Sequence, residues 1–518
     1  MNKTKEDKSS KKLFNVRPIV LWAFIVFLTV VFLNWAIIWA VVWLAALVVF
    51  FIVLQKIKPK NEFLNFLGTS QVFFVVSVIL IVLVMISFTV TTLIYTNQPA
   101  FTGNGTLQGT VRSFNINENG EGSFLLTNAS LNNENVRGRV RVNVRNLNTQ
   151  SIENIRTGAV VSVFTNIRGT SPSNFAINNS IRYTATINAR QVVFEQDARD
   201  VRSVVLRHVD GFISRHMSDD AGTLMYSMLF GDRSTLDDEI RDSFRLTGIA
   251  HILAVSGMHV GILVLVILWI LGALKLNKRA QIILILFFLL FYMYLCDFRI
   301  SIIRSSIMFF TFAFMRLFVR RIDLLTCICL AWIIVLVLFP YSLFSVSFKL
   351  SFGCMFGFAL FYRPVADWLG KYLGQSRVSK VIVNSLSAYT VTSITTTPFL
   401  IYYFGFVSIT GFFANVLLIP ILLIAFKATF VAIITYVGWP LLHLVDPFIR
   451  VILGVTNWLA GARWGTIQLD AVGAWYLFYF VGLFVISRFI FMERRTKIIV
   501  ASICFGVYVV SLIVVNLI

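Results

Sequence analysis

The sequence is short of acidic side chains, histidine and cysteine. Its 518 residues include 24 aspartates and glutamates against 45 lysines and arginines, a formal net charge of +21, and only five histidines and five cysteines. All five cysteines lie in apolar runs, where a thiol acts as a small hydrophobic group, so we expect neither a disulfide framework nor a metal site. No Gly-x-Ser-x-Gly, His-Glu-x-x-His or P-loop motif occurs. These gaps argue against a cofactor, a metal or nucleotide hydrolysis.

Charged residues of either sign are also scarce. They make up 13% of the chain, hydrophobic residues make up 58%, and the mean hydropathy is +0.81. The apolar runs reach the roughly 20 residues that one bilayer crossing needs, so we expect a multi-pass membrane protein. The basic excess has two explanations, because lysine and arginine gather in cytoplasmic loops and also attract a polyanion. Composition does not separate the two.

The N-terminal region reads as a basic cytoplasmic tail, residues 1–17, followed by a three-span membrane region, residues 18–96. The apolar run Ile19–Leu54 is broken near Asn34 and predicts two short antiparallel spans, and Gln71–Tyr95 predicts a third. The first run is too long for a signal peptide and lacks a small-residue cleavage site, so we expect a retained anchor. The basic tail places the N-terminus in the cytoplasm.

Residues 97–197 differ in composition and are rich in Asn, Gly, Thr and Arg. Five stretches of alternating apolar and polar residues predict half-buried strands, which suit a small extracytoplasmic barrel of the OB type. Four arginines alternate along one predicted strand, with Phe124 and Phe164 nearby. They either bind single-stranded DNA through charge and stacking or form a solvated face over core phenylalanines. These arginines are Arg137, Arg139, Arg141 and Arg145.

Residues 198–247 predict amphipathic helices that lie at the outer face without crossing the membrane. Asp232 falls in a turn between two of them. An aspartate there commonly caps a helix. Its position shortly before the next apolar run also makes it a candidate for the mouth of a pore.

The stretch Arg245–Gly261 opens the polytopic region, residues 248–518. It places His251, Ser256 and His259 at or just inside an expected membrane-depth helix. Polar side chains are costly there and tend to face a cavity or the bundle interior, although they also act as plain links between helices. Gly257, four residues before Gly261, predicts a helix face that a neighbouring backbone approaches closely. Ser256 and His259 also have the spacing of a nucleophile and its base, which leaves an intramembrane hydrolase open.

Basic loops recur through the polytopic region, the last large one spanning Arg363–Lys380, and they fix the direction of the helices. Two runs of only about 15 residues, Gly411–Ala425 and Ala428–Leu442, flank Lys427. They predict either a broken or re-entrant pair or a tilted ordinary hairpin whose lysine side chain extends to the membrane surface. His443–Leu469 predicts an amphipathic helix at the outer interface. We therefore expect a polytopic α-helical membrane protein with about 11–13 membrane segments, some short or re-entrant, and an inserted all-β OB-like barrel.

Within the apolar runs, cations outnumber acids. Arg304, Lys349 and Lys427 lie inside or at the edges of these runs, whereas Asp297 is the one clear acid. Such a distribution favours an anionic substrate. It suits a nucleic acid strand and equally a transporter of a small anionic or lipid-linked substrate.

Several motifs closely resemble those of one family, the ComEC-type competence proteins. Its pattern His-(Leu/Ile)-Leu-Ala-(Val/Ile)-Ser-Gly-(Leu/Met)-His-Val-Gly is reproduced position by position from His251 to Gly261. One departure is Lys349, which stands where the family usually has glutamine and would add charge to a pore or pair with Asp297. Other elements of the family pattern match at Leu229, Gly231, Asp232, Arg233, Phe244, Arg245, Gly248, Arg304, Ser305, Met308, Pro398, Phe404, Gly405, Ser408, Asn415 and Pro420.

The resemblance implies an inner-membrane channel, not an enzyme, that passes single-stranded DNA into the cytoplasm during natural transformation. It implies as partners membrane lipid, a DNA receptor, a separate nuclease and a cytoplasmic motor ATPase, and it allows a homo-oligomer. Many family members add a metallo-β-lactamase-like nuclease domain, whose His-x-His-x-Asp-His cluster does not occur in this sequence. The channel residues would be His251, Ser256, Gly257, His259, Asp232, Arg304, Lys349, Asn415 and Lys427.

Overall fold

The computed structural model divides the chain into two compact units, each built from separate stretches of sequence. The helical unit comprises Met1–Phe88, Ile322–Phe406 and Gln468–Ile518, and the barrel-bearing unit comprises Thr89–Arg321 and Val407–Ile467. The structure describes residues 18–57, 70–96, 103–116, 122–145, 157–170, 173–188, 191–233, 236–253, 255–318, 323–373, 376–436, 438–462, 465–470, 473–487 and 494–517.

The helical unit begins with the predicted pair of short helices. α1 (Pro18–Trp35) and α2 (Ile37–Ile57) are separated by Ala36 alone, and α4 (Gln71–Thr96) forms the third predicted segment before its last turns enter the other unit. α1 packs against α13 (Leu324–Leu338), where the rings of Phe27 and Trp332 lie 6.2 Å apart. The prediction of a break near Asn34 is confirmed.

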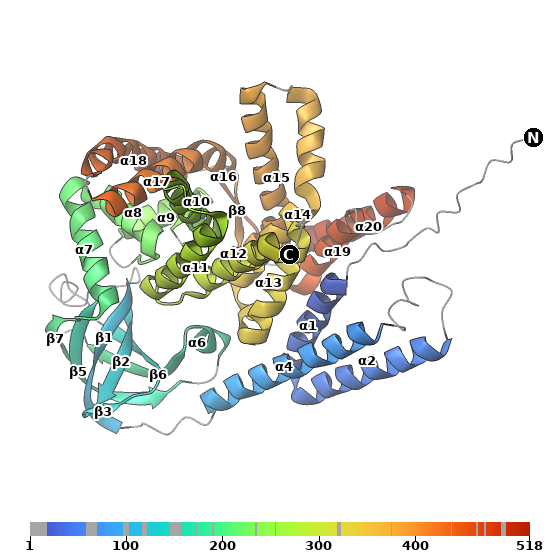
Figure 1. The fold of residues 1–518 in the computed structure, drawn as a ribbon, viewed down its shortest axis with the longest axis horizontal. Coiled ribbons are helices and arrows are strands. Elements are labelled where there is room, and N and C mark those ends of the chain that lie inside the picture. The colour runs from blue at the N-terminus through green and yellow to red at the C-terminus, as the bar shows by residue number, and fades with distance from the viewer. Residues whose placement is uncertain are drawn as a thin grey trace, which may run out of the picture. The chain divides into compact units, whose positions relative to one another are not determined.

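Two helices of 28 residues dominate the middle of the helical unit. α14 (Val346–Leu373) and α15 (Arg377–Phe404) lie side by side (Figure 1). Gly353 and Gly357 of α14 face Phe399 and Thr395 of α15, so the absence of a Cβ brings the two helices close together. Because α14 continues to Leu373, most of the basic segment predicted as a loop is helical. The unit also contains η3 (Pro340–Phe344), η5 (Gly473–Trp475), α19 (Tyr476–Ile486) and α20 (Arg494–Leu517).

The barrel has the predicted OB-like form. Its five main strands hydrogen-bond in the order β1-β2-β4-β6-β5, and β1 also pairs with β5, which closes the sheet. β4 and β6 are parallel and the other four pairings in this ring are antiparallel. The strands are β1 (Gly103–Ile116), β2 (Gly122–Leu131), β4 (Arg139–Arg145), β5 (Ala159–Gly169) and β6 (Ile181–Asn188), with β3 (Glu134–Asn135), β7 (Val192–Asp197) and the short helix α6 (Asn174–Asn178) added.

Alternation explains the interior of the barrel. Along β4 and β5 every second residue is buried, as the pleat of a half-buried strand requires. Phe124 belongs to the barrel core, whereas Phe164 is 63% exposed. The last alternating stretch, residues 181–194, contains β6 and the start of β7 and was wrongly predicted to be a single strand.

Three amphipathic helices follow the barrel, as predicted. Their apolar faces join α10, α11, α17 and α18 in one continuous core. Although they come much later in the sequence, α17 and α18 belong to the same unit and pack into this core. The helices are α7 (Val201–His216), α8 (Asp219–Phe230), α9 (Asp238–Leu246), η2 (Ala250–Ile252), α10 (Gly257–Ala273), α11 (Lys278–Leu295) and α12 (Ile300–Phe318), then α16 (Gly411–Phe413), the π-helix η4 (Ala414–Leu418), α17 (Ile419–Thr435) and α18 (Trp439–Ala460).

The predicted break at Lys427 is wrong. Lys427 lies on the exposed side of α17, which runs without interruption through this position. The irregular backbone lies earlier, in the π-turn η4, and Pro420 is tolerated because it stands in the first turn of α17. The amphipathic helix predicted from His443 begins earlier, at Trp439, and ends at Ala460.

The chain is a polytopic helical membrane protein with an inserted barrel. In the part of the chain that the structure describes, seven helices are long and apolar enough to cross a membrane, and four shorter helices are also apolar. Their large exposed aliphatic and aromatic side chains, which a soluble protein would bury, suit a lipid environment. The strands β8 (Phe406–Ser408) and β9 (Thr466–Gln468) pair where the chain passes between the two units.

Candidate functional site

The segment from His251 to Gly261 is not one helix. His251 lies in the single 3-10 turn η2, and α10 begins only at Gly257, with Ser256 in an extended conformation before it. The expectation that His251 and Ser256 share a membrane helix is therefore wrong. His251 is exposed. The pKa of its imidazole is nevertheless lowered from its ordinary value, because desolvation by surrounding protein outweighs a hydrogen bond with the Gly248 backbone. Its side chain thus has protein around it and still opens to solvent.

Ser256 and His259 meet, as their spacing predicts, but in a helix cap. The backbone N–H of Ser256 donates to His259 Nδ1 over 3.2 Å, and Ser256 Oγ lies 3.4 Å from the same nitrogen. A ring nitrogen that accepts from the backbone is not free to take the serine proton. His259 is fully buried, and its ring lies 4.8 Å from that of Phe426 on α17. This geometry favours a structural role for the pair over a nucleophile and its base.

α10 starts against α12. A Cβ on Gly257 would lie 3.3 Å from Ser305 Oγ, and Ser301 Oγ donates to the Val255 carbonyl over 2.7 Å. Gly261, in contrast, has nothing within 4 Å of its Cβ position. The close neighbour at Gly257 is therefore a side chain rather than the predicted backbone, and the predicted close approach fails at Gly261. Arg304, one residue before Ser305, is 1% exposed within α12.

A second set of contacts joins the turn at Gly248, just before His251, to the chain between Ser408 and Asn415, which precedes α17. Gly248 adopts a left-handed conformation with φ of +72°, and its Cβ position lies 3.1 Å from Ser408 Cβ. Ser408 Oγ donates to the Leu246 carbonyl over 2.7 Å and accepts from the Gly411 N–H. Asn415 Nδ2 donates to the Gly411 carbonyl over 2.6 Å. Asn415 thus braces the turn that holds the segment.

Asp232 lies in the turn after α8 and is buried. Its carboxylate accepts a 2.5 Å hydrogen bond from Thr157 Oγ1, which precedes strand β5 of the barrel. Asp237, not Asp232, caps α9, since the Asp237 carboxylate accepts from the Glu239 N–H. The expected capping role of Asp232 is therefore wrong, and its observed role is to link the barrel to the bundle.

A second link between barrel and bundle is ionic. Arg139 on β4 pairs with Asp297 at 3.1 Å, and both side chains are mostly shielded from solvent. Asp297 stands in the turn between α11 and α12, with φ of +58°. This pairing contradicts the option that Asp297 neutralises Lys349. Lys349, in the helical unit, instead donates to Tyr403 Oη over 2.5 Å.

Near these two links, three arginines donate hydrogen bonds to backbone carbonyls at the C-terminal ends of other helices. Arg202 donates to the Leu295 carbonyl over 2.8 Å, Arg233 donates to the Leu253 carbonyl over 3.0 Å, and Arg299 donates to the Gly231 carbonyl. Cations suit the negative ends of helix dipoles. We call this set of contacts, together with Thr157–Asp232 and Arg139–Asp297, the barrel junction.

Burial perturbs the charged groups of the barrel junction. Desolvation lowers the pKa of Arg202, and desolvation, followed by the charges of Arg299 and Arg241, lowers the pKa of Arg233 to about 10. Both arginines still carry their charge at neutral pH. Arg202 and Arg299 were not predicted from the sequence. The available signal was weak, namely basic residues beside predicted turns in a chain otherwise poor in buried charge.

The four barrel arginines share the outward side of β4 and the turn before it. Arg137 and Arg145 are exposed, whereas Arg139 and Arg141 are half-buried. The site residues predicted from the sequence therefore separate into groups. His251, Lys427 and the outer barrel arginines are open to solvent, Asp232, His259 and Arg304 are buried, and Lys349 lies in the other unit.

Fold and site together define a multi-pass helical membrane protein whose OB-like barrel is joined to the turns after α8 and α11. The sequence profile described as "Competence protein" matches residues 228–494, which is more than half of the chain. The chain belongs to this competence protein family.

Two curated relatives are each similar to part of the chain. The "ComE operon protein 3" of Bacillus subtilis (strain 168) is 29% identical over 214 residues, which cover 41% of this chain and 26% of the relative. The "Recombination protein 2" of Haemophilus influenzae is 26% identical over 207 residues, which cover 38% of this chain and 26% of the relative. The aligned part thus spans about a quarter of each of these relatives. No solved structure matches the chain.

Proposed function

We propose that this protein is a channel of the bacterial inner membrane that passes a single strand of DNA into the cytoplasm. The observation that carries the proposal is the barrel junction. It joins an OB-like barrel, a fold that often binds single strands, to the turns after α8 and α11, and Arg233 in the first of these turns donates to Leu253 of the family segment that precedes α10. A strand bound by the barrel would then arrive beside His251. Positive-inside charge puts the N-terminus in the cytoplasm and the barrel outside.

The predicted channel residues would act in two ways. His251 and Lys427, which are exposed, would contact the strand, as would Arg137 and Arg145 on the barrel. The remaining members, which make contacts within the protein, would hold the wall in place rather than touch DNA. This supporting group comprises Asp232, Ser256, Gly257, His259, Arg304 and Asn415. Lys349, beside Tyr403, would offer a cation together with an aromatic ring.

The proposal divides the work among several proteins. A DNA receptor would deliver DNA, a separate nuclease would degrade the second strand, and a cytoplasmic ATPase would supply the energy. The protein itself would perform no catalysis. The chain would comprise the tail 1–17, the spans 18–96, the barrel 97–197, the outer helices 198–247 and the channel 248–518.

Gene deletion in a naturally transformable host tests the function. We expect the number of transformants obtained with free DNA to fall to background and to recover when the full chain is restored. Transformation of the same strain by electroporation should be unchanged, because that route bypasses the channel. Undiminished natural transformation after deletion would sink the proposal. Lost transformation with unimpaired import of labelled single strands would place the protein at another step.

A further inference from the structure

Six rings gather where the C-terminal half of α7 meets the turn between α17 and α18. Three of the chain's five histidines are among them. Phe212 stacks on Tyr436 at 5.1 Å, His216 stacks on Trp439 at 5.6 Å, and the His216 and His443 rings lie 5.3 Å apart at 89°. His208 stacks on Tyr436 at 6.4 Å. We call these six residues the ring platform.

Four of the six rings of the ring platform are exposed, whereas Phe212 is buried and His216 is half-buried. Tyr436 is 58% exposed and Trp439 is 47% exposed, and His208 and His443 are exposed as well. Aromatic rings normally gather to leave water, so an exposed group built from two separate chain segments offers flat faces to something outside the protein. Nucleobases stack on such faces whatever their sequence, because every base has a π-face.

A polar stripe continues from the ring platform along α18. Its members recur three, four or seven positions apart, which confines them to an arc of about 60° at about 100° per residue. All six are exposed. They are Trp439, His443, Arg450, Gly454, Asn457 and Gly461.

The two neighbouring faces of α18 have other environments. One is buried in the protein core and includes Leu442, Ile449 and Leu453, and the other exposes the apolar side chains Leu444, Phe448 and Val451. α18 is long and apolar enough to cross a membrane. Polar side chains facing lipid on such a helix are costly, so the stripe borders water or a polar ligand.

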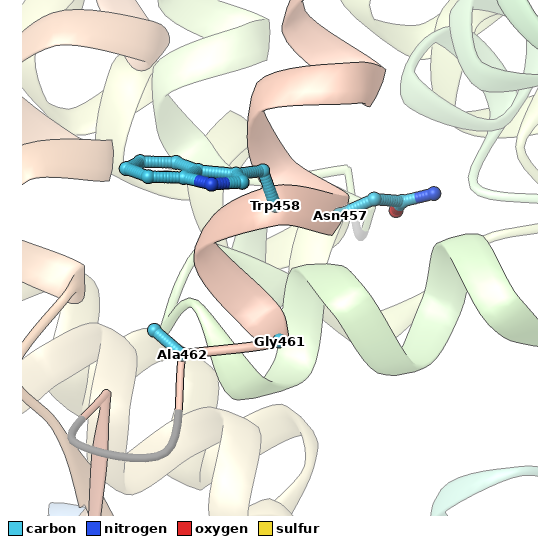
Figure 2. Close-up of a pocket in the computed structure, with 4 residues that line it drawn as sticks. All are labelled: Asn457, Trp458, Gly461 and Ala462. Carbon is cyan, nitrogen blue, oxygen red and sulfur yellow. The ribbon is translucent and has the colours of Figure 1, made fainter.

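Among the residues that the structure describes, none packs over the middle of the stripe at Gly454. A Cβ on Gly454 would have nothing within 4 Å. At the C-terminal end of α18 a shallow hollow is lined by Asn457, Trp458, Gly461 and Ala462, and Figure 2 shows these four residues at the end of the helix. The stripe therefore runs from the ring platform to this hollow on one side of α18.

Charge along the stripe is balanced. Arg450 pairs with the buried Asp446 at 2.9 Å, and Asp446 also accepts hydrogen bonds from Ser218. Further along, Asn457 Nδ2 lies 3.5 Å from Glu239. A strongly positive stripe would hold phosphates in place, whereas conduction needs contacts weak enough to release them.

We propose that the ring platform and the stripe of α18 contact a single strand of DNA in transit, with bases stacking on the rings and the backbone following the stripe. This inference rests on the proposed function and assigns it residues outside the predicted channel set. Trp439 and His216 supply the stacking faces. His443, Arg450 and Asn457 offer polar groups to the backbone, and Gly454 leaves room for it.

Cysteine accessibility in the full chain, reconstituted in liposomes, tests the stripe. Cysteines placed at His443, Gly454 and Asn457 should react with a charged thiol reagent, and those at the matched apolar positions Leu444, Phe448 and Val451 should not. A single-stranded oligonucleotide should slow the reaction at the stripe about tenfold. The unsubstituted chain gives the background from its native cysteines. Labelling that the oligonucleotide does not slow, or that only vesicles of anionic lipid slow, overturns the inference.

Alanine variants separate this inference from the proposed function. W439A and H216A should each lower transformation with free DNA about tenfold, by loss of one stacking face. F448A, whose ring is also exposed but lies on the apolar face of α18, should leave transformation unchanged. If gene deletion abolishes transformation while W439A and H216A behave like F448A, only the inference fails. If deletion itself has no effect, the proposed function fails first.

Discussion

The barrel junction and the stripe of α18 are both polar, but their polar groups have different partners. At the barrel junction Arg202, Arg233 and Arg299 are each committed to a backbone carbonyl inside the protein. Along the stripe His443 and Asn457 remain exposed, and only Arg450 has a charged partner within α18. Burial with a fixed partner indicates a structural role, whereas exposure on a membrane-length helix indicates contact with a ligand or water.

Removing a junction arginine should have the largest effect. Arg202 is 5% exposed, and R202A would leave the Leu295 carbonyl without this donor and unbalance the nearby carboxylates. We expect the free energy of unfolding to fall by about 3 kcal/mol. Thermal unfolding of the full chain in detergent measures the change. R215A, at the exposed end of the same helix, is the control, and equal losses in both variants would contradict the distinction.

Substituting the buried and the exposed partner of the Asp446–Arg450 ion pair should change stability by different amounts. D446A would leave two hydrogen bonds from Ser218 unmade and should cost about 2 kcal/mol of stability. R450A, whose side chain is 59% exposed, should cost less than about 1 kcal/mol. The same unfolding assay compares them. A larger loss in R450A would mean that the stripe is structural, like the barrel junction.

Much of the fold was predictable because its causes are local. Alternation along β1, β2, β4 and β5 predicted the strands, and the interruption near Asn34 predicted the break between α1 and α2. The start of α10 was not predictable by these means. It depends on the Gly248 turn and on a cap that His259 completes with its side chain, whereas apolar content alone extends the helix back to His251.

Most of the site depended on contacts between distant residues. Asp297 looked like a partner for Lys349 because both lie near apolar runs, yet it pairs with Arg139, on a strand 158 residues earlier in the chain. A break at Lys427 is the prediction from two flanking apolar runs that are each too short for one span, but an exposed lysine with a flexible stem does not interrupt a helix. Residue types alone did not carry this information.

Two glycines on α10 allow a tightly packed position to be compared with an open one, and we expect smaller changes in stability here. G257A would bring a Cβ to 3.3 Å from Ser305 Oγ, and we expect a loss of about 1 kcal/mol. G261A meets nothing within 4 Å and should be neutral or stabilise the helix by up to about 1 kcal/mol. Unfolding midpoints of the two variants should move in opposite directions or differ clearly. Equal destabilisation would show that a neighbour approaches Gly261 as well.

The smallest effect should be one of pH at the base of the barrel. Burial raises the pKa of Asp200, but a hydrogen bond from Ser203 and the charge of Arg112 outweigh it, so the pKa lies below its ordinary value. Stability from this carboxylate is therefore complete above about pH 4 and is lost as the pH falls through the folded-state pKa. D200N should flatten that decline by less than about 1 kcal/mol, because the side chain is 29% exposed. A pH series of unfolding midpoints for both proteins checks this.

The helical unit has a consequence for how the protein is made. Its α1 packs against α13, yet Phe27 leaves the ribosome long before its neighbour Trp332, with the barrel and α7 to α12 made in between. At about 5–20 residues per second, the roughly 300 intervening residues take about 15–60 seconds to synthesise. Throughout that interval α1 lacks its partner. Biogenesis of this protein therefore depends on keeping the early helices from pairing wrongly until the later ones have been inserted.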